Sequence, residues 1–152
     1  MMTRVTRTRP DAPEAVQLIT ELEAHLAPQY PQTSRHGYSV DKLLREAVAF
    51  FVVRQDDNAA GCGGIQLFGT DYGELKRMYV RPQYRGRGLA RLMLDHLAGY
   101  ARENGVAVLR LETGIYQTDA MRLYERWGFV RIPPFGAYHE DPLSAFYEKR
   151  IT

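Results

Sequence analysis

Residues 80–90 of this chain read Val80-Arg81-Pro82-Gln83-Tyr84-Arg85-Gly86-Arg87-Gly88-Leu89-Ala90. The stretch follows a strand-like run at 74–80 and precedes an amphipathic helix that we expect to begin at Leu89. Backbone N–H groups at such a strand-to-helix turn point toward one spot, together with the positive end of the helix dipole. Gly86 and Gly88 lack the Cβ that would keep an anion away from the backbone. The stretch therefore predicts a phosphate or pyrophosphate site.

Arginines are frequent around this turn, and we expect them to add positive charge for the phosphate: Arg77, Arg81, Arg85, Arg87 and Arg91. The alternative is an ordinary tight turn with solvated arginines. A kinase-type P-loop is excluded because the string Gly-x-x-x-x-Gly-Lys-Ser/Thr is missing. A dinucleotide-binding fingerprint is disfavoured because Arg91 stands where the third glycine belongs, and regular βαβ units do not follow.

Outward from the turn, hydrophobic patterning predicts one domain over residues 1–152. The expected elements are a strand at 3–8, helices at 11–26 and 40–46, strands at 50–53, 64–68 and 74–80, a helix from 89 to 104, a strand at 106–112, a helix at 119–127, and a final strand at 143–151. Three adjacent antiparallel strands followed by a helical crossover indicate a mixed sheet of the α/β (α+β) class, with about six to seven strands and about four helices.

Composition narrows the function classes. With 152 residues, 45% of them hydrophobic, the chain suits a single core, and its net charge of +2 argues against binding nucleic acid through the arginine cluster. A membrane is not expected, because no apolar run approaches about 18 residues. Cys62 is the only cysteine and the N-terminus lacks an apolar leader, so we expect a cytoplasmic protein. The four histidines lie far apart, and we expect no metal.

Two motifs resemble those of the GCN5-related N-acetyltransferase (GNAT) superfamily. Its central pattern, Arg/Gln-x-x-Gly-x-Gly/Ala a few residues after Val-x-Pro, is matched by the six residues 85–90 after Val80-Arg81-Pro82. A second register that begins at Gln83 also fits the bare string. The family's downstream element is matched by Ala120, Leu123-Tyr124 and Gly128-Phe129. The resemblance covers roughly residues 50–151.

The resemblance implies that the chain binds acetyl-CoA as co-substrate, and it makes a homodimer plausible. The pyrophosphate would lie on backbone N–H groups of Arg85, Gly86, Arg87, Gly88, Leu89 and Ala90. The pantetheine arm would lie between two splayed parallel strands, against the backbone of Met78, Tyr79 and Val80. Gln117 stands where the family often has Asn, which places the same contact with the coenzyme in doubt.

The implied reaction is transfer of the acetyl group from acetyl-CoA to a primary amine by direct attack in a ternary complex. Glu74 occupies the place of the glutamate in histone-modifying members, and we interpret it as the base; the alternative is a carboxylate paired with Lys76 or Arg77. Tyr124 matches the family's acid, and its pKa near 10 lets it protonate a thiolate. The alternative for Tyr124 is a core aromatic.

The acceptor amine is expected to bind turn-rich segments beside the sheet. Candidates are Tyr30, His36, Tyr38, Phe135, Tyr138 and His139, with Glu112 as partner for a cationic amine. The alternative for each aromatic is ordinary packing over the sheet. The acceptor could be a small molecule or a protein. A second hypothesis, a non-catalytic acyl-CoA-binding sensor or structural module, is disfavoured by the presence of both Glu74 and Tyr124.

Overall fold

A seven-stranded mixed sheet forms the centre of the protein, as the computed structural model shows for residues 2–152. The strands are β1 (Thr3–Arg7), β2 (Ala49–Gln55), β3 (Asn58–Phe68), β4 (Tyr72–Val80), β5 (Val108–Gly114), β6 (Val130–Ile132) and β7 (Ser144–Arg150). Their order is β1-β2-β3-β4-β5-β7-β6, with β4 and β5 the parallel pair. The predicted mixed α/β architecture is confirmed.

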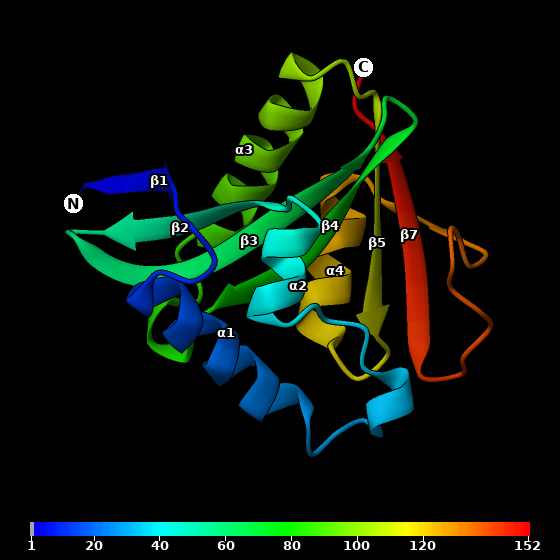
Figure 1. Cartoon of the computed structure of the whole chain (residues 1–152), viewed down its shortest axis with the longest axis horizontal. Helices are drawn as coiled ribbons and strands as arrows, with labels where there is room; N and C mark the ends of the chain where they lie inside the picture. Colours follow the sequence, from blue (N-terminus) through cyan, green and yellow to red (C-terminus); the bar gives the residue numbers. More distant parts are fainter. Residues whose placement is uncertain (1) are drawn as a thin grey trace.

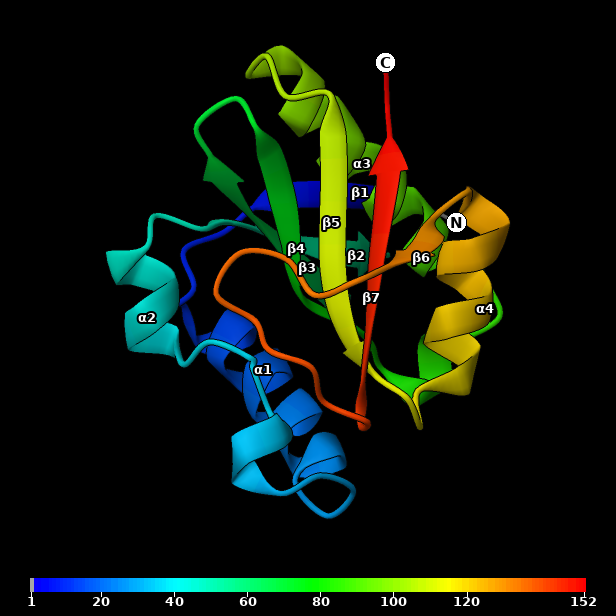
Figure 2. The ribbon, with the colours of Figure 1, turned by 90° about the vertical axis from the view of Figure 1, so that its right-hand side faces the viewer.

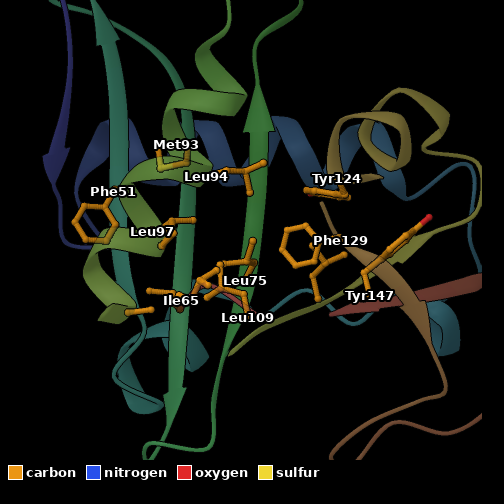
Figure 3. Packing of buried hydrophobic residues seen from close by; sticks show 14 of the residues in the cluster. Phe51, Ile65, Leu75, Met93, Leu94, Leu97, Leu109, Tyr124, Phe129 and Tyr147 are labelled. Atoms are coloured by element: carbon orange, nitrogen blue, oxygen red, sulfur yellow. The ribbon is translucent and has the colours of Figure 1, made fainter. Parts of the chain in front are cut away.

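Helices cover both faces of the sheet (Figure 1). They are α1 (Pro13–Leu26), α2 (Val40–Arg45), α3 (Leu89–Glu103) and α4 (Thr118–Trp127). The apolar stripe of α3 includes Met93, Leu94 and Leu97, which are at most 1% exposed and pack toward Ile65 of the sheet (Figure 3). Tyr124 of α4 belongs to this same buried cluster, whereas α1 and α2 form a second core on the other face.

Several element boundaries differ from the sequence prediction, and two of the differences have a clear physical reason. Helix α1 begins at Pro13 and not at the predicted residue 11. The Asp11 carboxylate pairs with Arg9 at 3.0 Å and does not cap the helix. Proline suits a first helical position because its fixed φ is already helical and its missing N–H is not needed there. Strand β3 starts at Asn58, six residues before the predicted start. The prediction missed these residues because residues 59–63 are small and give no alternating hydrophobic pattern.

A β-bulge in β4 opens the sheet where the site forms. Cys62 faces Tyr79 and Gly64 faces Lys76, so Gly63 stands opposite two residues of β4. One of the two, Arg77, has a left-handed φ of 55°. A bulge bends its strand and increases the local twist. β4 pairs with β5 only at Gly73–Leu109 and Glu74–Arg110, after which the strands diverge (Figure 1).

Candidate active site

The glycine turn that joins β4 to α3 has the conformation that an anion site requires. Gly86 and Gly88 both have a φ of 77°, and Gly88 is the N-cap of α3. A Cβ added at either position would meet no atom within 4 Å, so glycine is required here for its backbone conformation, and the space beside it is open. The first N–H groups of α3 have no partner within the helix. This arrangement supports the predicted pyrophosphate site.

The arginines around the turn are arranged differently from the prediction. Arg81 is bound to Glu21 of α1 at 2.9 Å, and Arg77 to Glu23 of α1 at 2.9 Å. Arg87 donates a hydrogen bond to Gln55, while Arg85 donates to the carbonyl of Val80 at 3.1 Å. The prediction of phosphate contacts is therefore wrong for Arg77 and Arg81, because acidic residues of α1, distant in sequence, hold both.

A cavity of about 510 Å³, here called the turn cavity, extends from the glycine turn along the end of β4 to the first part of α4. Eight residues predicted to bind the coenzyme line it: Met78, Tyr79, Val80, Arg85, Gly86, Ala90, Gln117 and Tyr124. Arg87, Gly88 and Leu89 do not line it, and the Leu89 side chain is in the core. His25, Gln29 and Tyr116 also line the cavity, and no motif in the sequence indicated them.

Gln117 is a fixed part of the wall of this cavity. Its amide nitrogen donates to Gln29 Oε1 at 3.2 Å and to the Tyr30 hydroxyl at 3.1 Å. Its amide oxygen lies 3.2 Å from His25 Nε2. These contacts connect the N-terminus of α4 to the C-terminal end of α1 and its following loop. The side chain therefore positions α1 against α4.

A smaller cavity of about 140 Å³, the inner cavity, adjoins the turn cavity. Residues that line both cavities are Leu22, Met78, Gln117, Ala120 and Tyr124. Tyr124 thus lies at the junction of the two cavities, and its hydroxyl makes no hydrogen bond to any of residues 2–152. Burial, reinforced by the charge of Glu112, raises the pKa of Tyr124 above its ordinary value, so the phenol retains its proton.

Two carboxylates line the inner cavity in different environments. Glu74 is 3% exposed, lies 2.8 Å from Lys76 Nζ, and accepts a hydrogen bond from the Tyr138 hydroxyl at 2.5 Å. Glu112 accepts one from Ser144 Oγ at 2.8 Å and has no salt-bridge partner within residues 2–152. Burial raises the pKa of Glu112 to about 7, despite the opposing effects of Ser144 and Lys76.

The predicted acceptor residues separate into three groups. His36 and Tyr138 line both the inner cavity and a third cavity of about 550 Å³, the vestibule, which Tyr38 and His139 also line. Tyr30 lines the inner cavity, but its hydroxyl accepts a hydrogen bond from the Tyr116 N–H at 3.0 Å. Phe135 lines none of the three cavities and packs 5.2 Å from Tyr138, centroid to centroid.

The vestibule lies between segments that are far apart in the sequence. Figure 2 shows the β6–β7 connection (orange) crossing in front of β5 toward the segment that precedes α2. Residues 33–42 and 136–141 contribute to the lining from these two sides. The vestibule adjoins the inner cavity, because six residues line both: Arg35, His36, Gly37, Glu74, Lys76 and Tyr138.

The sequence pattern of the acetyltransferase (GNAT) family matches residues 15–129. The chain belongs to this family. Over 97% of both chains it is 40% identical to a protein of Azospirillum brasilense named IAA acetyltransferase. It is 32% identical to the uncharacterized N-acetyltransferase YsnE of Bacillus subtilis, over 91% of this chain and 93% of the relative.

Solved structures show the same GNAT fold. A structure from Klebsiella pneumoniae has a TM-score of 0.83 and 35% identity, with 99% of each chain covered. The PaiA N-acetyltransferase of Thermoplasma acidophilum, solved in complex with coenzyme A, has a TM-score of 0.79 and 19% identity, again over 99% of each chain. This GNAT protein is an acetyl-CoA-dependent N-acetyltransferase. None of the helices in residues 2–152 is long and apolar enough to cross a membrane.

Proposed function

We propose that the protein transfers an acetyl group from acetyl-CoA directly to a primary amine in a ternary complex, with Glu112 as base and Tyr124 as acid. One observation carries this proposal: Tyr124 stands where the turn cavity meets the inner cavity, and Glu112 lines the inner one. A coenzyme in the first cavity and an amine in the second would meet beside both groups.

Two parts of the turn cavity suit two parts of the coenzyme. The amides of the glycine turn would bind the pyrophosphate, and the edge of β4 that β5 leaves unpaired would bind the pantetheine arm. That edge runs through Met78, Tyr79 and Val80. Acetyl-CoA, when bound, supplies the activated acetyl group as a thioester. The left-handed Arg77 reorients the following N–H groups, which are candidates to polarise the thioester carbonyl.

Glu112 is better suited than Glu74 to accept a proton from the amine. An acceptor amine with an ordinary pKa near 10.4 is protonated at neutral pH and must lose a proton before it attacks. A base works best when its pKa lies near the working pH, as that of Glu112 does at about 7. Glu74 is already bound to Lys76 and Tyr138. We therefore assign Glu74 to positioning these two side chains.

Tyr124 is the proposed donor of a proton to the departing thiolate. Its raised pKa keeps the hydroxyl protonated, and a thiolate with a conjugate acid near pKa 8.5 is basic enough to accept that proton. The ring is fixed by packing at 5.7 Å from Phe129 and 6.3 Å from Tyr147, centroid to centroid (Figure 3). This packing leaves the hydroxyl without a hydrogen-bond partner among residues 2–152 and available to the thiolate.

The acceptor is a small-molecule amine in this proposal, since the inner cavity is small and reached through the vestibule. Three possibilities compete with this proposal. The acceptor could be a protein amino group, it could be the acceptor of the Azospirillum relative, or the protein could be a non-catalytic binding module. Homodimer formation and a cytoplasmic location stay predictions.

The substitution Tyr124→Phe tests the proposal. It removes only the hydroxyl oxygen, which has no hydrogen-bond partner among residues 2–152, so folding and acetyl-CoA binding, measured by calorimetry, should be unchanged. The turnover number, measured as thiol release with a panel of amines, should fall about 10²- to 10⁴-fold. Full activity in this variant would remove Tyr124 from the mechanism. Failure of the wild-type protein to turn over any amine, with acetyl-CoA bound, would favour the binding module.

A further inference from the structure

The wall of the inner cavity formed by α1, the loop before α2 and β4 carries an unbalanced positive charge. Glu23 Oε1 accepts a hydrogen bond from Arg35 Nη1 at 2.8 Å, and its Oε2 accepts one from Arg77 Nη1 at 2.9 Å. One carboxylate thus pairs with two guanidinium groups. The nearby Lys76 is balanced by Glu74. One positive charge remains on this wall for a ligand.

One edge of Arg35 makes no hydrogen bond within residues 2–152, whereas the corresponding edge of Arg77 is used. The Nε of Arg35 is buried and has no hydrogen-bond partner within residues 2–152. A buried donor without an acceptor is unfavourable and rare. In arginine, Nε and one Nη form an edge that binds a carboxylate through two parallel hydrogen bonds. In Arg77 that edge is used, because its Nε donates to the carbonyl of Tyr38 at 3.0 Å.

On β5 the same cavity offers a complementary charge, Glu112, a carboxylate that has no salt-bridge partner within residues 2–152. Its volume of about 140 Å³ accommodates on the order of ten water-sized groups. A ligand that satisfies both walls is therefore small and carries an amine together with an anionic group.

We propose that the acceptor is an amino acid whose amine lies at Glu112 and whose carboxylate binds the free edge of Arg35. This inference rests on the proposed function and specifies its substrate class. Arg77 supports the site by sharing Glu23 with Arg35. The vestibule, lined by Tyr38, Tyr72 and Tyr138 among others, leaves space for the side chain of the amino acid.

Matched pairs of acceptors test the inference: alanine against ethylamine, and phenylalanine against phenethylamine, with β-alanine and γ-aminobutyrate varying the distance from amine to carboxylate. Thiol release from acetyl-CoA gives KM and kcat for each. At least one amino acid should have a KM about tenfold or more below that of its decarboxylated partner, because a charge-assisted bidentate contact is lost.

Arg35→Gln should raise the KM for that amino acid about ten- to hundredfold and leave the KM for the decarboxylated amine unchanged. Arg35→Lys keeps the charge without the bidentate edge, so its KM for the amino acid should lie between those of the wild type and Arg35→Gln. Arg54→Gln is the matched control, because Arg54 pairs with Glu14 and lines none of the three cavities. Thermal melting checks that each variant is folded.

Equal KM values within every pair, or an Arg35→Gln variant that affects both members alike, would overturn the inference. So would a preference for aminoalkylphosphonates over amino acids. Calorimetry of amino acids on the CoA-bound protein separates the two proposals. Binding of an amino acid that requires Arg35 but gives no turnover supports this site and refutes the proposed function. Turnover of decarboxylated amines without turnover of amino acids supports the proposed function and refutes the amino-acid site.

Discussion

Replacing Glu112 by Gln should stabilise the ligand-free protein at high pH. The folded protein retains the Glu112 proton up to a pKa of about 7, whereas an unfolded chain releases it near 4.5. Between these values the folded state binds more protons, so the free energy of unfolding falls as pH rises from 4.5 to 7. The difference of about 2.5 in pKa, at about 1.4 kcal/mol for each unit, amounts to about 3 kcal/mol.

Glu112→Gln has no charge to bury and can still accept the hydrogen bond from Ser144. The excess stability of the variant over wild type should therefore grow by about 3 kcal/mol between pH 4.5 and pH 8. Urea unfolding at both pH values, extrapolated to water, measures it. Glu103→Gln, the same substitution on an exposed residue at the end of α3, is the control.

The kinetic result must agree with the thermodynamic one. In the wild type, kcat/KM should rise with pH through about 7 as Glu112 loses its proton, and Glu112→Gln should lose this inflection together with most of the activity. A stability difference that is the same at pH 4.5 and pH 8 would show that burial does not hold the Glu112 proton. The choice of Glu112 over Glu74 as base would then lose its physical basis.

Two further substitutions test the turn and the buried ion pair. Gly88→Ala places a side chain at a φ of 77°, which should lower the free energy of unfolding by about 1–2 kcal/mol and weaken acetyl-CoA binding measured by calorimetry. Gly99→Ala is its control. It lies in the interior of α3 with open space around it and should instead raise the free energy of unfolding by about 0.5–1 kcal/mol. Lys76→Met leaves Glu74 buried without its cation, so the free energy of unfolding measured with urea at pH 7 should fall by about 3–5 kcal/mol. A fall of less than about 1 kcal/mol would contradict the importance of this ion pair.

The local parts of the site could be predicted from the sequence, because they depend on neighbouring residues. Gly86 and Gly88 lie within one turn, and Tyr124 lies on a helix whose end is marked by Gly128. Backbone conformation and helical spacing are encoded over a few residues. The adjacent antiparallel strands and the parallel neighbour β5 followed from the same kind of local pattern together with the helical crossover, whereas the place of β7 between β5 and β6 did not.

The contacts of α1 could not be predicted in this way. Arg77 and Arg81 lie beside the glycine turn in sequence, and only the position of α1 over the sheet shows that Glu23 and Glu21 bind them. The burial of Glu74 and Glu112 has the same origin. Lys76, the ion-pair partner of Glu74, is close in sequence and was one of the expected alternatives, but Tyr138 and Ser144, which donate hydrogen bonds to Glu74 and Glu112, lie more than 30 residues away. No local pattern carries such information.

The bulge at Arg77 connects these features. A left-handed residue inside a strand is strained, and such strain persists only where the surroundings enforce it. Here Gly63 leaves room for the extra residue, since a Cβ at that position would lie 2.7 Å from the Met78 sulfur. The same bulge turns the Arg77 side chain toward Glu23 and bends β4 away from β5. One local distortion therefore opens the space between the strands and fixes the shared carboxylate that positions Arg35 at the inner cavity.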